Sequence, residues 1–425
     1  MHYRYFHMYS EKELLALYEN EFPYSIKHLY LIFKYLLRPL KQLAHFSYNF
    51  NKYGIVKNSI LFFYMTKNNY DALKPVCDKL KPYSRMVTTN YNDNKSDEYL
   101  SNFIIYVLSI IMTVFHMRLL ISLWLNHKFV FRLFYIQIIE SIGFYYYSKY
   151  YIWQSKPRGL IISSDHSAFP RALVKAANMY SIPTFYLQHA SIAENYPPLF
   201  TKYALLEGED SKQKYQKAGE SSSDIYLVGI SKYDSTKDWN NSREGIKTIG
   251  VCTTRAMEKE QTEKVIKVIR SGIKDIDIVL RTHPSTETRA KYANIISDCE
   301  LKFSDSKSED VFSFLKKIDC IISGNSSILL EASLMDILPI YLRYKDVEYD
   351  KYSYVRNGVS KDAKNVEEVL KIIQGSLKKK ESTREKCKYY VDTIGTEYEY
   401  NSAFLAAKII GMKTSFNNHE PNNEN

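Results

Sequence analysis

The sequence has few cysteines, and their spacing suggests neither a disulfide framework nor a metal site. The 425 residues include five cysteines, and no two of them form a CxxC pair. A disulfide framework and a cysteine metal site both need cysteines that are closer together and paired, so neither is the basis of the fold. The opening residues "MHYRYFHMYSEKELL" also lack the basic start, apolar centre and small-residue cleavage site of a signal peptide. These absences predict reduced thiols in a cytoplasmic protein.

Acidic residues are in the minority. The 47 Asp and Glu residues are outnumbered by 58 Lys and Arg, which gives a net charge of +11 and a pI near 9.0. An excess of positive charge favours an anionic partner, such as a phosphate, a nucleotide or the surface of an acidic membrane. No zinc-finger, helix-turn-helix or RNP-type pattern occurs, so we expect no nucleic-acid partner.

No internal repeat is present, but strand-like and helix-like segments alternate in both halves of the chain. Examples are "GLIISS", "PTFYLQHA" and "DIDIVLRTHPS", each adjacent to a helix-like segment. This alternation predicts βαβ units, and therefore an α/β fold of two Rossmann-like domains that face a cleft. The predicted parts are a helical N-terminal segment (1–55), a first domain (56–235) with an apolar helical insertion (100–155), a polar linker (231–245), a second domain (245–375), a C-terminal helix (376–412) and a disordered tail (413–425).

The apolar stretch from Phe103 to Leu125 is long enough to span a bilayer. His116 and Arg118 lie inside it, however, and an arginine at the centre of a membrane helix costs about 2.5 to 3.5 kcal/mol. Buried helices, or a face resting on the membrane, are therefore favoured over a transmembrane span. We expect a peripheral protein on the inner face of the plasma membrane.

Polar clusters follow several predicted strands, which is where open parallel sheets bind ligands. The candidate residues are Asp165 and His166, Gln188 and His189, Glu207, Glu209 and Asp210, Arg281 and His283, and Ser323, Asn325, Ser326 and Ser327.

The cluster "SGNSS" precedes a helix, so Ser326 or Ser327 could cap that helix or help to bind an anion. Glu331, one turn later, could accept hydrogen bonds from ribose hydroxyls or be an ordinary helix residue. Pro284 restricts His283 to an extended conformation. Either element alone is more typical of a structural turn. Their occurrence in nearby βα units favours a phosphate site.

Three motifs carry a resemblance to known enzymes: "LLEGED" (205–210), "RTHPS" (281–285) and "SGNSSILLEAS" (323–333), in this order. The chain resembles, over residues 158–375, the GT-B superfamily of surface-polysaccharide transferases. These include sialyl- and polysialyltransferases, Kdo transferases and CDP-glycerol glycerophosphotransferases. "YLQHA" is similar to the Gln-His-Gly of some members, with Ala190 in place of glycine. "SGNSS" lacks the Asp-Tyr that often precedes Ser-Ser in glycerophosphotransferases, which favours sugar transfer.

The resemblance implies a metal-independent inverting glycosyltransferase with no cofactor beyond its substrates. It would move a sugar from a nucleotide-activated donor, with a CMP-sugar favoured, to a surface polysaccharide or lipid-linked glycan. Two other interpretations stay open: a CDP-glycerol-type glycerophosphotransferase, and a non-catalytic scaffold of a polysaccharide assembly complex. A sugar-nucleotide epimerase of the same architecture would need denser acid, Arg and His motifs in both halves than this sequence shows.

The implied roles divide between the domains. The second domain would hold the nucleotide through Ser323, Asn325, Glu331 and the residues that neutralise the leaving phosphate, which are Arg281, His283, Ser326 and Ser327. In the first domain, Glu207 is the first choice for the base that deprotonates the acceptor, Asp210 is the second, and His189 or Asp165 follows. His189, near the acceptor, would face His283 across the cleft.

Overall fold

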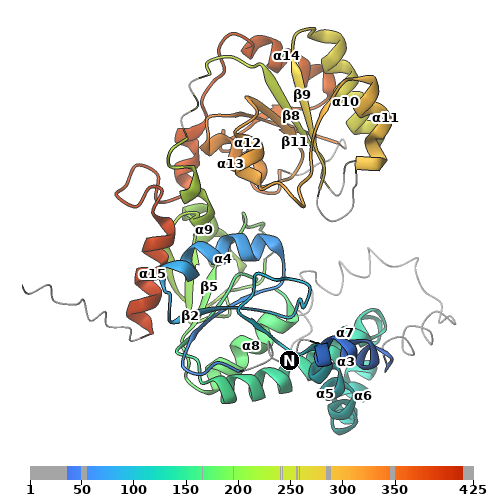
Figure 1. Ribbon diagram of the computed structural model, residues 1–425, viewed down its shortest axis with the longest axis vertical. Coiled ribbons are helices and arrows are strands. Elements are labelled where there is room, and N and C mark those ends of the chain that lie inside the picture. Colours follow the sequence, from blue (N-terminus) through green and yellow to red (C-terminus); the bar gives the residue numbers. More distant parts are fainter. Residues whose placement is uncertain are drawn as a thin grey trace, which may run out of the picture.

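The computed structural model describes residues 36–48, 55–164, 166–194, 196–239, 241, 243–254, 257, 259–283, 289–344 and 350–414. Two parallel sheets, one above the other in Figure 1, form the architecture. Most of the predicted N-terminal segment, the tail from 415 onward and Asp165 lie outside the described residues.

The first sheet has seven strands in the order β3-β2-β1-β4-β5-β6-β7, and all its pairs are parallel. Its strands are β1 Ile60–Tyr64, β2 Ser84–Thr88, β3 Glu98–Tyr99, β4 Gly159–Ile162, β5 Thr184–Leu187, β6 Tyr203–Leu206 and β7 Asp224–Leu227. The helices of this part are α3 Arg38–Tyr48, α4 Lys67–Lys79, α5 Asn102–Phe115, α6 Met117–Asn126, α7 Lys128–Ser155, α8 Ala168–Met179 and α9 Glu209–Ala218.

The second sheet has six strands in the order β10-β9-β8-β11-β12-β13, again all parallel. Its strands are β8 Thr248–Cys252, β9 Asp277–Arg281, β10 Lys302–Ser304, β11 Cys320–Ser323, β12 Leu338–Leu342 and β13 Lys361–Ala363. The helices that follow are α10 Lys259–Gly272, α11 Ala293–Asp298, α12 Val311–Leu315, α13 Ile328–Leu334, α14 Val366–Ser376 and α15 Ser402–Lys413, with 3-10 helices η3 Ser231–Thr236, η4 Arg289–Tyr292 and η5 Arg384–Tyr389.

The run "ILFFY" of β1 explains why both faces of the first sheet are covered. Ile60, Phe62 and Tyr64 pack with α4 and α15 on one face, whereas Leu61 and Phe63 pack with α7 and α8 on the other. Side chains alternate between the faces of a strand, so a strand that is apolar at every position needs a layer of helices on each side. The prediction of an α/β fold with two such sheets is confirmed.

The predicted C-terminal helix 376–412 is wrong in its extent. The helix α14 ends at Ser376, a 3-10 helix covers Arg384–Tyr389, and α15 begins only at Ser402. Gly395 has a φ of +74° and Tyr400 one of +60°, conformations that interrupt a helix. α15 then packs against the first sheet, where Ala406 and Ile410 are completely buried. The chain thus ends its described part in the domain in which it began.

The predicted linker 231–245 lies between the two domains, and its start is an ordered turn. Residues Ser231–Thr236 form the 3-10 helix η3, and Tyr233 is buried. The Tyr233 hydroxyl donates to the Leu334 carbonyl of the second domain at 2.8 Å, and the Ser231 hydroxyl donates to the Ala72 carbonyl of the first at 2.6 Å. This segment therefore packs against both domains.

The apolar stretch 103–125 forms two helices that meet at His116. The two helices, α5 and α6, are bent by 78° relative to one another. Within the described residues, no individual helix has the length and apolarity of a membrane span, and this bent pair alone meets the criteria when its helices are taken together.

Candidate functional site

The carboxyl ends of the two sheets meet at the boundary between the domains. Lys67, which follows β1, donates to the Ser306 carbonyl after β10 at 3.5 Å. The hydroxyl of Ser191, after β5, bonds to that of Tyr354, which lies between β12 and β13. Lys232, after β7, pairs with Glu331 of α13. Because ligands of open parallel sheets bind beyond the strand ends, this boundary is the candidate site.

At the first sheet, Gln188 and Glu207 hold the ends of β5 and β6 together. The Gln188 amide nitrogen donates to Glu207 Oε2 at 2.9 Å and to the Ser211 hydroxyl at 2.8 Å. The Glu207 backbone N–H donates back to Gln188 Oε1 at 2.9 Å. The two side chains meet because β5 and β6 are neighbouring strands, and each residue directly follows the last residue of its strand. Gln188 is thereby fixed in one orientation.

The C-terminal segment covers this cluster. A Cβ on Gly208 would lie 2.5 Å from the Tyr390 carbonyl oxygen, so the backbone can pass here only because residue 208 has no side chain. The Asp392 N–H donates to the Glu207 carbonyl at 3.0 Å. Glu207 is consequently 3% exposed. The carboxylate that the sequence favoured as the base is therefore covered in this structure.

Burial determines the protonation of Glu207. Desolvation raises the pKa of its carboxyl to about 8, although the nearby charge of Lys232 acts in the opposite direction. At pH 7 the carboxyl is mostly protonated, so in this conformation it holds a proton more readily than it accepts one.

Lys232 and Glu331 form a buried ion pair between the connector η3 and helix α13, with side chains 16% and 6% exposed. Burial by itself lowers the pKa of Lys232, but Glu331 and then Glu207 more than offset this, and the pKa is raised. Glu331 was expected as a candidate for ribose hydroxyls. Its Oε1 instead accepts from Lys232, so in this conformation it joins the domains.

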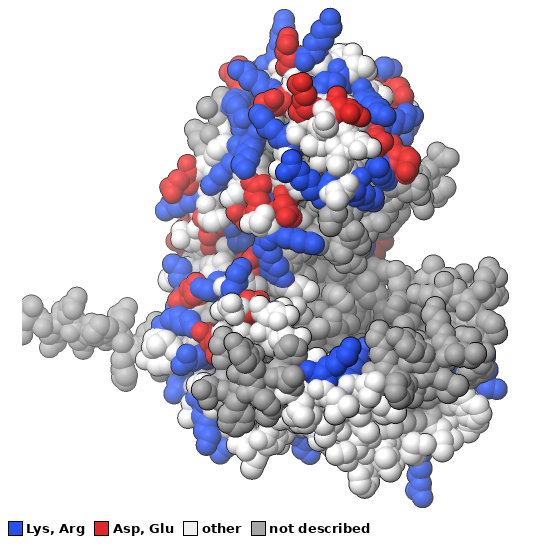
Figure 2. All heavy atoms as spheres, turned by 45° about the vertical axis from the view of Figure 1, so that its right-hand side comes forward, with Lys and Arg blue, Asp and Glu red and all other residues white. Residues whose placement is uncertain are grey.

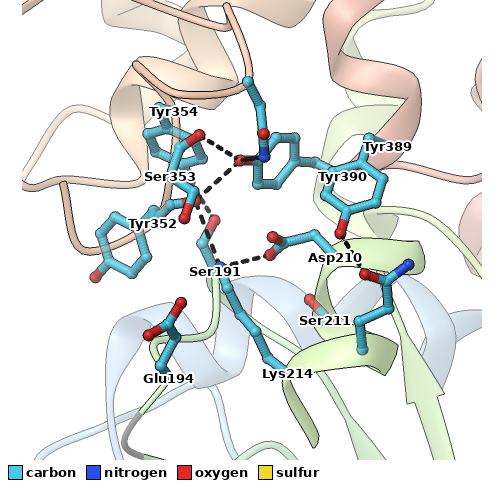
Figure 3. A network of polar contacts seen from close by, with 12 residues as sticks. Ser191, Glu194, Asp210, Ser211, Lys214, Tyr352, Ser353, Tyr354, Tyr389 and Tyr390 are labelled. Carbon is cyan, nitrogen blue, oxygen red and sulfur yellow. Dashed lines mark hydrogen bonds and ion pairs between the residues drawn. The ribbon is translucent and has the colours of Figure 1, made fainter. Parts of the chain in front are cut away.

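Asp210 belongs to a second buried cluster, shown in Figure 3. Its Oδ2 accepts from Lys214 Nζ at 2.8 Å, and both side chains are almost completely buried. Lys214 also donates to the Tyr352 carbonyl of the second domain at 3.4 Å. Burial raises the pKa of Asp210, and Lys214 counteracts the shift. Its ion pair makes Asp210 a weaker candidate for the base than the sequence suggested.

Tyrosines complete this boundary around Lys214 (Figure 3). The Tyr390 hydroxyl donates to the carbonyls of Tyr352 and Ser353 at 2.9 and 3.0 Å. The Tyr389 hydroxyl donates to Gln213 Oε1 of α9 at 2.8 Å. These bonds connect the C-terminal segment to both domains.

His189 follows Gln188 directly and is half-buried. Its neighbour is held by Glu207 and Ser211, which limits where the histidine can move. The other histidine at this sheet end, His166, packs its ring edge-on against Tyr196 with centroids 5.3 Å apart. His189 is thus a predicted first-domain candidate that combines a firmly held neighbour with partial exposure.

At the second sheet, the loop after β9 places Arg281 and His283 differently. Arg281 is buried, and its guanidinium donates to the Ser304 hydroxyl at 2.6 Å and to the Glu309 carbonyl at 3.0 Å. It therefore stabilises its own domain, which argues against the expected phosphate role. His283 is half-buried, and its backbone N–H donates to the Thr253 hydroxyl at 2.9 Å.

The residues of the "SGNSS" loop also differ in burial and in their contacts. Ser323 is buried and donates to the Cys252 carbonyl at 3.1 Å, so it joins β11 to β8. Asn325 Oδ1 accepts from the Lys351 N–H at 3.0 Å. Ser326 and Ser327 are half-buried at the start of α13, and the Ser326 hydroxyl accepts from the Ile328 N–H at 3.4 Å. Ser323 therefore has a structural role, and Ser327 stands at the N-cap of α13 without a side-chain capping bond.

Lys232 is a residue of this boundary that the sequence did not single out as a site residue. Lys232 directly follows the β7 strand end in "LVGISKYD", and its place at a strand end was the available signal. Within the described part of the chain, no group of three or more His, Cys, Asp or Glu side chains could hold a metal ion.

Solved structures share this architecture at low sequence identity. A Listeria monocytogenes protein described as a UDP-N-acetylglucosamine 2-epimerase has a TM-score of 0.58 at 14% identity, covering 85% of this chain and 97% of that one. The Neisseria meningitidis UDP-GlcNAc 2-epimerase bound to UDP-GlcNAc has a TM-score of 0.52 at 14% identity, covering 83% and 99%. A variant of the wall teichoic acid polymerase TagF has a TM-score of 0.50 at 11% identity, covering 93% and 99%.

These likenesses establish the GT-B fold, as the sequence predicted. No protein-family model and no curated protein matches the chain. Epimerases and a polymerase of cell-wall teichoic acid share the fold, so the architecture alone does not select an activity.

Proposed function

We propose that the protein is a transferase that takes a group from a nucleotide-activated donor and delivers it to a hydroxyl of a surface glycan or lipid-linked acceptor. The observation that carries the proposal is the meeting of two parallel sheets at their carboxyl ends, with a half-buried histidine beyond a strand of each. The order of "LLEGED", "RTHPS" and "SGNSS", which resembles surface-polysaccharide transferases, supports it. So does the net charge of +11, which suits a phosphorylated donor.

In this proposal the second domain binds the donor. His283 and the donors of Ser326 and Ser327 stabilise the negative charge that develops on the leaving phosphate. Preorganised donors of this kind contribute about 3 to 4 kcal/mol each to the transition state. Arg281 is left out of this step, because its guanidinium is buried and is held by Ser304 and Glu309.

In the first domain, His189 is the better-placed base. It is half-buried, whereas Glu207 is 3% exposed and mostly protonated at pH 7, and Asp210 is paired with Lys214. Glu207 acts through Gln188 as a positioning residue. Movement of the segment at Tyr390 away from Gly208 would uncover Glu207 and return it to the role of base, so the turnover of Glu207→Gln is measured beside that of His189→Ala.

The experiment is incubation of the full chain with CMP-, CDP-, UDP- and GDP-linked donors without an acceptor, followed by separation of the nucleotides. A transferase slowly hydrolyses its donor and releases free nucleotide. An epimerase returns an intact sugar nucleotide with altered stereochemistry, and a scaffold leaves every donor unchanged. Either of the last two outcomes would contradict the proposal. Hydrolysis of a CMP-sugar supports sugar transfer, and hydrolysis of CDP-glycerol supports glycerophosphate transfer.

His283→Ala and His189→Ala then test the roles. Each should lower turnover by on the order of a hundredfold, since each removes one group that acts on developing charge or on a proton. His283→Ala should leave the melting temperature nearly unchanged, because the bond to Thr253 comes from its backbone. Lys302→Ala in the same domain is the matched control, with a side chain 65% exposed. Near-normal turnover of His283→Ala would show that "RTHP" is a structural turn.

A further inference from the structure

The helices α5 and α6 expose a concentration of large apolar side chains. On these two helices Ile111, Val114, Phe115, Met117, Leu119, Ile121, Trp124 and Leu125 are each between 39% and 75% exposed. Leu36, Leu37, Leu40 and Leu43 of the neighbouring segment are exposed as well. Monomeric soluble proteins rarely expose so many large apolar side chains on neighbouring helices without using them for binding. We call these twelve residues the apolar face.

The bend at His116 explains why α6 is exposed. The N-terminal half of α5 is anchored against α7, where a Cβ on Gly143 would lie 1.9 Å from the Ser109 hydroxyl. The 78° bend then directs α6 away from this anchor. Only Leu120 of α6 is buried. An apolar helix that packs on a single side is costly in water, so the rest of its surface is suited to a second apolar phase.

The polar residues of α6 are arranged for an interface. Arg118, Ser122 and Asn126 are four residues apart and therefore form one stripe along the helix. Met117, Ile121 and Leu125 form the adjoining stripe at the same spacing. A helix that lies in the plane of a membrane has such a division, whereas a helix that crosses the bilayer does not.

The charges around the apolar face are almost all positive. Residues 36–43 and 100–155 contain one acidic residue, Glu140. It is already paired with Arg38. The other basic residues of these segments are Lys41, Arg118, Lys128, Arg132 and Lys149. The lowest part of the surface in Figure 2 accordingly shows blue and white side chains and no red ones. This charge distribution complements an anionic surface.

We infer that the apolar face docks the protein onto an anionic lipid bilayer, with α6 lying in the interfacial plane. Trp124, with Lys128 positioned 5.4 Å over its ring, sits at the headgroup level. Figure 1 shows α5 and α6 on the side of the first domain remote from the second, so docking leaves the domain boundary uncovered. A bilayer is favoured over a second copy of the chain, because two faces of like charge repel each other.

The test is sedimentation of the full chain with vesicles of phosphatidylcholine, with and without phosphatidylglycerol. Binding should be stronger with the anionic lipid. Phe115→Ser/Leu125→Ser should weaken binding on the order of tenfold or more, because it removes apolar area that would enter the membrane. Phe404→Ser/Met412→Ser is the matched control, since these α15 residues are 50% and 61% exposed on another side of the domain. The control should bind like the unchanged protein.

The contribution of the basic residues and the depth of Trp124 in the bilayer are tested in separate experiments. Arg118→Gln/Lys128→Gln should weaken binding to anionic vesicles on the order of tenfold and leave binding to neutral vesicles unchanged. The chain has three tryptophans. Replacing Trp153 and Trp239 by phenylalanine leaves Trp124 as the reporter, and its emission should shift to the blue on vesicles. Spin-labelled lipids should quench it most near the headgroups.

Four outcomes would overturn the inference. The first is that the protein binds neither kind of vesicle, and the second is that the α15 control loses as much vesicle binding as the Phe115/Leu125 variant. The third is that Trp124 fluorescence is quenched most strongly by labels at the bilayer centre. The fourth is that the Phe115/Leu125 variant loses self-association in light scattering while its vesicle binding is unchanged. The last would identify a second copy of the chain as the partner. None of these measurements depends on donor turnover, so the inference stands or fails independently of the proposed function.

Discussion

The two sheet ends that meet at the domain boundary differ in how their polar groups are held. At the first sheet, Gln188, Glu207 and Asp210 are buried and bonded to one another or to Lys214. At the second, His283, Ser326 and Ser327 are half-buried on loops. Buried, satisfied polar groups fix one geometry, whereas partly exposed donors remain able to take a ligand. Changes to the buried groups of the first end should therefore mainly affect stability, and changes to the half-buried groups of the second mainly turnover.

The largest effect is expected for Lys232→Met. It leaves Glu331 buried without its partner, and breaking a buried ion pair in this way costs about 3 to 5 kcal/mol. The measurement is thermal and denaturant unfolding. Lys232→Met/Glu331→Leu should recover much of the loss, because both charges are then absent. Lys302→Met, which breaks an exposed pair with Asp277, should change stability little. If Lys232→Met and Lys302→Met lowered stability equally, the buried ion pair would matter no more than the exposed one.

The next effect concerns pH. The folded-state pKa of Glu207, about 8, is above its ordinary value of 4.5, so its contribution to stability is complete below pH 4.5 and is lost as the pH rises towards 8. One pKa unit corresponds to about 1.4 kcal/mol. The melting temperature of the unchanged protein should therefore fall from pH 5 to pH 8 more than that of Glu207→Gln. Parallel profiles of the two proteins would mean that Glu207 is ionised in the folded state.

Gln188→Leu should cost about 1 to 3 kcal/mol, since the buried Glu207 N–H loses its acceptor. Turnover should fall as well, because His189 loses its fixed neighbour, and the pH profile of turnover should change with it. Gln374→Leu on the exposed surface of α14 is the control. Lowered stability with an unchanged pH profile of turnover would restrict Gln188 to a structural role.

The smallest effect on stability is expected at the second sheet end, for Thr253→Val. Loss of the hydroxyl that accepts from the His283 N–H should cost about 1 kcal/mol. If this bond orients the histidine for catalysis, turnover should fall several-fold, although the small loss of stability leaves nearly all of the protein folded. If Thr253→Val clearly lowered stability and left turnover unchanged, the second sheet end would respond to substitution as the first does. That result would contradict the difference between the two ends.

The sequence was a good guide to the position of strands and of polar clusters beyond them. The run "ILFFY" and the alternation after Gly159 follow from local periodicity, and the strands β1, β4 to β9, β11 and β12 lie where it indicated them. The sequence did not indicate the short strands β3, β10 and β13, nor β2. Periodicity says less about the interruption of a polar helical pattern, which is why the helix predicted over 376–412 is a 3-10 helix and α15 in the structure.

The sequence by itself determined the α/β fold and the order of the three motifs, because side-chain alternation and turn residues act over a few neighbouring positions. Tertiary structure alone decided which motif residues are available for chemistry. Glu207 is covered because the backbone at Tyr390 crosses Gly208, and Glu331 is occupied because Lys232 reaches it from the connector. Such contacts join segments far apart in the chain, and they depend on how the two domains close. Burial and pKa follow from that closure, so no local pattern encodes them.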